Sequence, residues 1–220
     1  MNKKIKTLFH GGRQAFSVSL VLMVICGFLF PILLTGLSAI FFPYQAEGSL
    51  LKVKDKAVAS ENVGQEFLED YYMWSRPSAY HYNVYTENKE GDKRYQDGSE
   101  FPGIASGSNN YAPSNPDLIK RVEADMQDFL DKNKGIQPED IPTDLLTASG
   151  SGLDPHISPE SARIQIPRIV EASGLSKALV QNIIKKHTDE KLLGVMGEES
   201  VNVVKVNIEI AKEMGLIQDE

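Results

Sequence analysis

The sequence predicts a mixed α/β chain: a single N-terminal transmembrane helix followed by one α+β extracytoplasmic domain. The first observation behind this prediction is the charge distribution, because no charged residue lies between Gln14 and Ala46, while the rest of the 220-residue chain holds every charged side chain. The second is the region after Phe42, where apolar residues at helical spacing alternate with short β-rich pieces. One span cannot enclose a channel, so any activity within the membrane would need partner proteins.

The predicted membrane anchor runs from Ala15 to Phe42. Its 28 residues would extend about 42 Å as a helix, at about 1.5 Å per residue, against about 30 Å of bilayer hydrocarbon. A cleaved signal peptide has a shorter apolar region before its small-residue cleavage site, whereas here Gly36-Leu37-Ser38 is followed by further apolar residues. We therefore expect an uncleaved, single-pass anchor in the lipid bilayer of the cell membrane.

The basic residues before the anchor predict its orientation. Lys3, Lys4, Lys6 and Arg13 precede the span without any acidic residue, and basic segments stay on the cytoplasmic side. We therefore expect a cytoplasmic N-terminus and a main domain outside the cytoplasm. The predicted organisation is a short basic arm over residues 1–14, the anchor over 15–42, a linker over 43–60 and a soluble α/β domain over 61–220.

One face of the anchor carries small or helix-perturbing residues. Gly27, Pro31 and Thr35 recur every four residues and so share that face. Small residues let two helix backbones approach closely, and a neighbouring helix can pair with the carbonyl that Pro31 leaves free. The face therefore predicts a packing site for another transmembrane helix, and a lipid-facing kink is the alternative.

Composition excludes several classes of function for the polar part of the chain. Four basic residues and no acidic one precede residue 44, so the remainder holds 19 basic and 30 acidic side chains and a net charge of −11. Phosphate neutralisation needs clustered Lys and Arg, so we exclude a nucleic-acid partner. The one cysteine, Cys26, lies within the apolar stretch. The polar domain therefore has no disulfide framework and no thiolate ligands for a metal.

Four further segments after the anchor are predicted from apolar spacing, polarity or β-rich composition. Apolar spacing predicts a helix from Glu61 to Trp74, ended by Arg76-Pro77. The polar, glycine-punctuated run from Tyr85 to Phe101 predicts an exposed excursion. Short strands are expected near Lys52 to Val58 and near Leu145 to Ala148.

Three helix starts carry N-cap residues, and the C-terminal segment is ambiguous. We expect helices to begin at Asn115-Pro116, at Ser158-Pro159 and at Ser176, because Asn and Ser accept hydrogen bonds from the first free backbone amides. Gly135, Gly174 and His187 mark their expected ends, and Pro167 is expected to strain or kink the second. Residues 201–214 fit both an alternating strand and a helical face, and we favour the helix slightly.

The loop from Thr147 to Pro159 holds the candidate functional side chains. It gathers Ser149, Ser151, Asp154, His156 and Ser158, the residue types of nucleophilic hydrolysis. The spacing does not match that of a serine hydrolase. The sequence A-S-G-S-G is not the G-x-S-x-G elbow, and Asp154 and His156 are separated only by Pro155. A metal site would lack an evident third ligand. We favour a turn-rich structural loop whose Ser158 caps the following helix, and we predict neither a catalytic residue nor a metal site.

The chain also lacks the motifs of known ATP-hydrolysing machinery. The sequence contains no Walker A loop, no H-E-x-x-H and no phosphorylatable Asp-Lys-Thr-Gly motif. If the chain takes part in transport, the energy must come from elsewhere.

Several motifs together resemble the C subunit of the bacterial Kdp potassium-transporting P-type ATPase. The longest is T-A-S-G-S-G-L-D-P-H-I-S-P from Thr147 to Pro159, and the resemblance covers nearly the whole chain. The other matching segments are Arg76-Pro77-Ser78-Ala79, Ser106-Gly107-Ser108-Asn109, Pro113-Ser114-Asn115-Pro116, Gln165 with Arg168, Val201-Asn202-Val203 and Val206-Asn207.

The resemblance implies a non-catalytic accessory subunit of an ATP-driven, high-affinity potassium importer. Its implied partners are an ATPase subunit and a channel-like potassium-binding subunit, together with a small single-span subunit. The family role implied is that of a catalytic chaperone raising the ATP affinity of the ATPase subunit, with Gln165 as a candidate nucleotide contact. No tightly bound cofactor is implied; ATP belongs to the partner and potassium is the transported ion. The alternative is a membrane-anchored hydrolase or binding module that uses the loop from Ser149 to His156.

Overall fold

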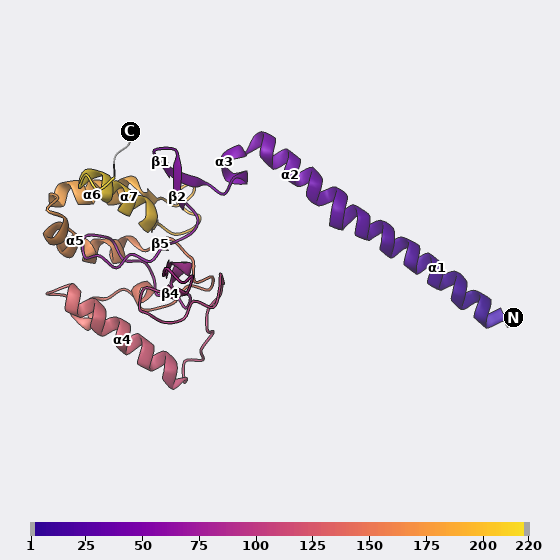
Figure 1. The fold of residues 1–220 in the computed structure, drawn as a ribbon, viewed down its shortest axis with the longest axis horizontal. Coiled ribbons are helices and arrows are strands. Elements are labelled where there is room, and N and C mark those ends of the chain that lie inside the picture. The colour runs from indigo at the N-terminus through magenta and orange to yellow at the C-terminus, as the bar shows by residue number, and fades with distance from the viewer. Residues whose placement is uncertain (1–2, 218–220) are drawn as a thin grey trace. The chain divides into compact units, whose positions relative to one another are not determined.

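The computed structural model describes residues 3–217 and confirms the predicted fold class, an N-terminal apolar helix and an α+β domain (Figure 1). The chain divides into two compact units, Met1–Ser49 and Leu50–Glu220. The first two residues of the predicted basic arm and the last three of the predicted domain lie outside the described residues.

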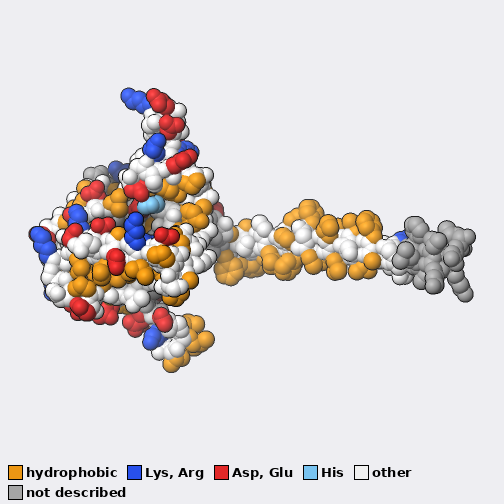
Figure 2. All heavy atoms as spheres, turned by 90° about the horizontal axis from the view of Figure 1, so that it is seen from below, with side chains coloured by type: hydrophobic (Ala, Val, Ile, Leu, Met, Phe, Trp, Pro, Cys, Tyr) orange, Lys and Arg blue, Asp and Glu red, His pale blue; other side chains and the backbone are white. Residues whose placement is uncertain are grey.

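The first unit is a long apolar helix. It consists of α1 (Lys3–Val24), a π-helical turn η1 (Ile25–Leu29) and α2 (Phe30–Phe41), and the short α3 (Pro43–Ala46) follows. Residues Gly11–Phe41 are long and apolar enough to cross a membrane. In Figure 2, hydrophobic side chains lie along this helix, whereas the surface of the domain carries many charged side chains.

The π-helical turn has a local cause in Pro31. Proline has no N–H, and its ring collides with the carbonyl four residues earlier in a regular α-helix, here that of Gly27. A wider turn over Ile25–Leu29 directly before the proline lets the helix continue without a break. Apart from the adjacent backbone of the helix itself, no atom of the described residues lies within 4 Å of a Cβ placed on Gly27, so this position is open to a neighbour.

The second unit begins with a β-hairpin of β1 (Leu50–Val53) and β2 (Lys56–Ser60), which confirms the strand expected near residues 52–58. The strand expected near 145–148 is wrong. A 3₁₀ turn, η4 (Thr143–Leu145), stands at its start, where the Asp144 carboxylate binds the start of the next helix. This local side-chain bond favours a turn over a paired strand.

The helix expected from Glu61 to Trp74 is also wrong, because this segment is irregular. At Met73 and Trp74, its backbone bonds go to side chains of helices that are distant in the sequence. The amide of Asn207 pairs with both the N–H and the C=O of Met73, and the amide of Gln165 does the same for Trp74. These contacts satisfy a buried backbone as well as a helix would, so tertiary packing overrides the local apolar spacing.

The polar segment of residues 85–101 is largely exposed, as expected, and it contains a hairpin that the sequence did not predict. Strands β3 (Tyr85–Glu87) and β4 (Lys93–Tyr95) pair antiparallel. Tyr85 stacks on Phe101 with ring centroids 4.5 Å apart, and Tyr95 is buried. The aromatic rings therefore hold the base of the hairpin. The 3₁₀ turn η2 (His81–Asn83) precedes it.

All three predicted helix starts are confirmed. Helix α4 (Pro116–Lys132) begins after Asn115, α5 (Pro159–Ser173) after Ser158 and α6 (Lys177–Lys186) after Ser176, and each cap side chain accepts a backbone N–H. Helix α5 ends at a left-handed Gly174, as expected. It passes Pro167 without a break because that residue is exposed, so water can bind the carbonyl that proline leaves unpaired. A further 3₁₀ turn, η3 (Pro138–Asp140), lies between α4 and η4.

The C-terminal segment contains both structures that its pattern allowed. Strand β7 (Ser200–Asn202) pairs with β5 (His156–Ile157) and with β6 (Thr188–Asp189), and α7 (Val203–Glu213) follows directly. The preferred helix is therefore confirmed for most of residues 201–214. The side chain of Asn202 ends the strand and caps the helix by accepting the N–H of Lys205.

One apolar core joins α4, α5, α6 and α7. In Figure 1, α6 and α7 lie at one end of the domain, α5 in the middle and α4 at the other end. The fully buried apolar side chains at its centre are Met73, Ala162, Ile169, Val180, Val201, Val203, Val206 and Ile210. The loop from Thr147 to Pro159 runs into this core through β5.

Candidate functional site

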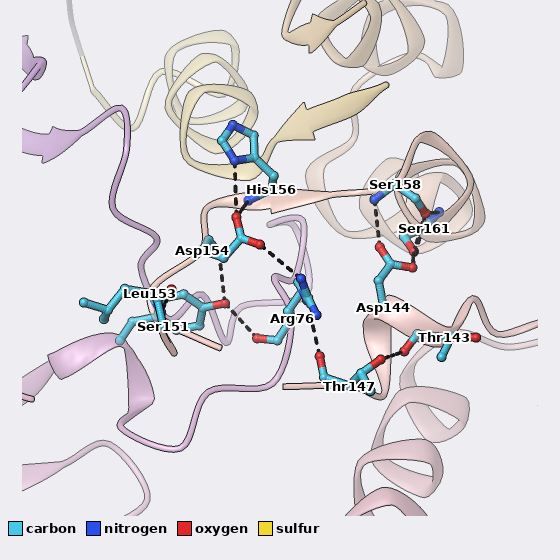
Figure 3. Close-up of polar contacts among 11 residues, drawn as sticks. Arg76, Thr143, Asp144, Thr147, Ser151, Leu153, Asp154, His156, Ser158 and Ser161 are labelled. Carbon is cyan, nitrogen blue, oxygen red and sulfur yellow. Dashed lines mark hydrogen bonds and ion pairs between the residues drawn. The ribbon is translucent and has the colours of Figure 1, made fainter. Parts of the chain in front are cut away.

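Side chains from three separate parts of the chain hold the loop from Thr147 to Pro159, and Figure 3 shows two of them, Arg76 and Asp144. Arg76 reaches it from the irregular segment, Asp144 from η4, and Asn202 lies opposite it on β7. The loop is thus the meeting point of segments that are far apart in the sequence.

Asp154 is at the centre of this arrangement. One carboxylate oxygen accepts the backbone N–H of His156 at 3.0 Å and lies 3.2 Å from its ring Nδ1, and the other accepts from Arg76 at 3.1 Å. The hydrogen bond from the His156 ring lowers the pKa of the Asp154 carboxyl, helped by the backbone bond and the Arg76 charge, although partial burial acts in the opposite direction. Asp154 therefore stays ionised and joins the loop to Arg76.

His156 is oriented from both sides of its ring. Its Nδ1 faces Asp154, and its Nε2 lies 3.4 Å from the side-chain nitrogen of Asn202, which also donates to the carbonyl of Glu61 at 2.8 Å. This arrangement fits Nδ1 as the donor to Asp154 and Nε2 as the acceptor from Asn202. The backbone of His156 pairs with Asn202 in the sheet.

The serines of the loop do not form a hydrolytic arrangement with His156. Ser149 is buried and its hydroxyl has no partner, while the Ser151 hydroxyl accepts the N–H of Leu153. Figure 3 shows the His156 ring on the other side of Asp154 from Ser151. Within residues 3–217, no hydrogen bond joins His156 to either serine. A base that reaches no hydroxyl cannot activate one in this geometry.

Ser158 has the structural role that the sequence suggested. Its hydroxyl accepts the N–H of Ser161 and so caps α5, while its own N–H donates to Asp144 at 2.7 Å. The hydroxyl of Ser161 also donates to Asp144 at 2.6 Å. The carboxylate lies beside the positive end of the α5 dipole, which stabilises both the charge and the helix start.

Glycine is required where the loop meets the segment around Gly107. Gly152 has a φ of +67°, and a Cβ there would lie 2.6 Å from the carbonyl oxygen of Gly107. The N–H of Gly107 donates to the carbonyl of Ser151 at 2.7 Å, and Ser78 donates to the carbonyl of Gly152 at 2.6 Å. These contacts fix the shape of the loop from outside.

Gln165 lies in the interior of the domain, fully buried on α5. Its Oε1 accepts from the N–H of Trp74 and from Arg168, and its Nε2 donates to the carbonyls of Trp74 and Ser161. These four bonds use its full hydrogen-bonding capacity. The nucleotide contact of Gln165 stays a prediction, and it would require this side chain to leave Trp74 and Arg168.

Arg168 is the charged member of this interior cluster. It donates to neutral oxygens, and its guanidinium carbon lies 4.3 Å from the centre of the Trp74 ring. Its acceptors are Asn133 Oδ1 at 3.0 Å, Gln165 Oε1 at 2.7 Å, and the carbonyls of Asp70 at 2.5 Å and Tyr72 at 2.9 Å. Burial lowers the pKa of Arg168 to about 10, so it remains charged at neutral pH.

Sequence reasoning missed what Gln165, Arg168 and Asn207 do for the fold. The available signal was that these polar residues share helix faces with apolar neighbours such as Ile169 and Ile210, where a solvated side chain is not expected. Such a polar residue needs a buried partner, which here is the backbone of residues 70–74.

Metal ligands were not expected in this chain. In the part of the chain that the structure describes, no group of three or more His, Cys, Asp or Glu side chains could hold a metal ion.

Comparison with known proteins gives the chain its family. The model of the family described as KdpC, K⁺-transporting ATPase, c chain, matches residues 12–212. The chain belongs to the KdpC family. The loop of residues 147–159 and the buried cluster around Gln165 and Arg168 therefore belong to a subunit of a potassium-transporting ATPase, as the sequence motifs implied.

Relatives named as potassium-transporting ATPase KdpC subunits match over almost their entire length. The protein of Clostridium kluyveri is 52% identical over 212 residues, which are 96% of this chain and 98% of the relative. The protein of Clostridioides difficile is 49% identical, over 93% of this chain and 98% of its own length. The KdpC subunit of Caldanaerobacter subterraneus is 37% identical, with 92% and 95% of the two chains covered.

Proposed function

We propose that this chain is an accessory, non-catalytic subunit of an ATP-driven, high-affinity potassium uptake complex. It works in the cell membrane beside an ATPase subunit and a channel-like potassium-binding subunit. The observation that carries the proposal is the family match over residues 12–212, since the matching relatives are named as potassium-transporting ATPase KdpC subunits.

The contacts of the loop support the non-catalytic part of the proposal. Asp154 binds Arg76, His156 faces Asn202, and Ser158 caps a helix. Each group that could take part in hydrolysis therefore has a structural partner. Ser149 is the exception: it is buried, and its hydroxyl makes no hydrogen bond to a base within the described residues.

The orientation follows from charge. The four basic residues before the span favour a cytoplasmic N-terminus, which places the acidic domain outside. A domain outside the membrane does not meet cytoplasmic ATP, so a role in raising ATP affinity would act through the partner subunits. The full burial of Gln165 agrees with an indirect role.

The proposal is tested by isolating the complex in mild detergent through a C-terminal tag on this chain. We expect multi-span partners to co-purify and the eluate to hydrolyse ATP in response to potassium. Complexes assembled without this chain should lose that activity. Recovery of the tagged chain alone would contradict the proposal.

A double variant tests the proposal that this chain is non-catalytic. Ser149→Ala with Ser151→Ala should leave the potassium-stimulated ATPase rate unchanged, because neither hydroxyl contacts a base. A rate that falls while the assembly stays intact would favour the hydrolase alternative.

A further inference from the structure

The segment between β6 and β7 ends in large apolar side chains that the domain leaves uncovered. Leu192 is 67% exposed, Leu193 84%, Val195 79% and Met196 59%. Figure 2 shows a segment that projects from the domain and ends in hydrophobic side chains. A cluster of this kind on a folded domain marks a surface that another molecule covers. We call residues 191–197 the apolar tip.

The apolar tip has a defined backbone. Leu192 and Met196 form a bridge, with the N–H of each donating to the carbonyl of the other at 2.8 and 3.0 Å. The turn between them includes Leu193 at φ +55° and Gly194 at φ +74°. The left-handed region is costly for leucine, so the turn keeps an apolar residue where glycine or asparagine would be easier. A defined tip presents its side chains with little ordering cost on binding.

Acidic residues flank the apolar tip on both sides. Asp189 and Glu190 precede it, Glu198 and Glu199 follow it, and Lys191 is the one basic residue within residues 189–199. All five side chains are exposed. An anionic lipid surface would repel this border, since such surfaces attract Lys and Arg. A second copy of this chain, with a net charge of −11 over residues 44–220, would repel it too.

We propose that the apolar tip inserts into an apolar groove on a partner subunit of the transport complex, and that lysine or arginine side chains border this groove. Apolar burial supplies the attraction, and the acidic flanks set the orientation against the basic border. The proposal rests on the proposed function for the existence of the partner subunits, and it adds the surface that meets them.

Photo-crosslinking tests the contact in the assembled complex. A photoreactive benzoylphenylalanine replaces Leu193, and the matched control carries it at Ile104, which is 86% exposed outside the tip. Irradiation of the purified complex should join position 193, and not position 104, to a partner subunit at residues within an apolar groove. Adducts with lipid alone, with a second copy of this chain, or with nothing would overturn the proposal.

Substitutions test the apolar attraction and the charge complementarity separately. Leu193→Asp with Val195→Asp should lower recovery of the partner subunits by about tenfold, as expected for central interface residues, whereas Ile104→Asp should not. Glu190→Lys with Glu198→Lys should weaken recovery at low salt and make it less dependent on salt. Undiminished recovery in both tip variants would overturn the proposal.

The outcomes separate this proposal from the proposed function. If the unmodified chain isolates without partners, the proposed function fails. If it isolates with partners but the tip variants do too, only the contact assigned to the tip is wrong.

Discussion

Arg168 shows how a single residue can organise an irregular segment. Its guanidinium binds the carbonyls of Asp70 and Tyr72, the side chains of Asn133 and Gln165, and the face of Trp74. A buried cation is costly unless its donors are satisfied, and these contacts satisfy them. Arg168 is thereby the link between α5 and the chain that leads into the domain.

Replacing Arg168 should destabilise the domain strongly. In Arg168→Leu the four acceptors lose a charged donor and are left buried, so we expect a loss of about 3–5 kcal/mol in the free energy of unfolding. Denaturation of the full chain in detergent can be followed by the fluorescence of Trp74, the one tryptophan. Arg163→Leu on the same helix is the control, because Arg163 pairs with Glu160 on the surface. It should cost less than about 0.5 kcal/mol, and equal losses would contradict the role given to Arg168.

The lowered pKa of Asp154 predicts a pH dependence of stability. Because the folded pKa lies below the unfolded value of 3.8, the carboxylate stabilises the fold above that value and loses its effect as the pH falls through the folded pKa. The difference in Tm between the unmodified chain and Asp154→Asn should therefore be largest near neutral pH and shrink below about pH 4. A Tm difference that is independent of pH would contradict this account.

At the scale of single residues, the sequence predicted the role of a loop residue, Ser158, but not the partners of the buried polar residues. The cap role of Ser158 followed from its position before Pro159, because capping depends on a few neighbouring amides. Nothing local showed that Asn207 would pair with Met73, 134 positions away. Such contacts depend on the assembled fold, and periodicity does not contain them.

At the scale of elements, the best predictions rested on residues whose effect is local. The starts of α4, α5 and α6 were found from Asn or Ser caps, and Gly174 marked an end. The helix expected over residues 61–74 failed because its apolar residues pack without helical geometry. The backbone of Met73 and Trp74 instead binds side chains on α5 and α7. These partners are distant in the sequence, so the residues of the segment alone could not indicate them.

Gly152 provides a test of how the loop docks. Gly152→Ala should lower the free energy of unfolding by about 2 kcal/mol or more, since alanine is strained at positive φ and its Cβ would meet the carbonyl of Gly107. Gly150→Ala is the matched control, because a Cβ there meets nothing within 4 Å and its φ is not positive. Thermal unfolding of both variants gives the comparison. Equal stability would show that the loop does not need this contact.

At the scale of the whole molecule, the uneven distribution of charged residues along the sequence predicted an apolar helix followed by a polar domain. The uncharged stretch from Gln14 to Ala46 corresponds to the apolar helix, and the acidic remainder folds as the α+β domain. Hydropathy identifies a span well because a bilayer imposes one simple requirement on its length. The apolar tip was missed because a short Leu-Leu-Gly-Val-Met run is equally typical of a buried turn.

The side of the membrane on which the domain lies is central to the proposed role, and thiol labelling measures it directly. Ile104→Cys in a Cys26→Ser background places one exposed thiol in the domain, and Gly12→Cys in the same background places one at the N-terminal end of the candidate span Gly11–Phe41. An impermeant thiol reagent should label Ile104→Cys in intact cells or spheroplasts, and should label Gly12→Cys only after the membrane is permeabilised. The reverse pattern would place the domain in the cytoplasm and contradict the outward orientation proposed for it.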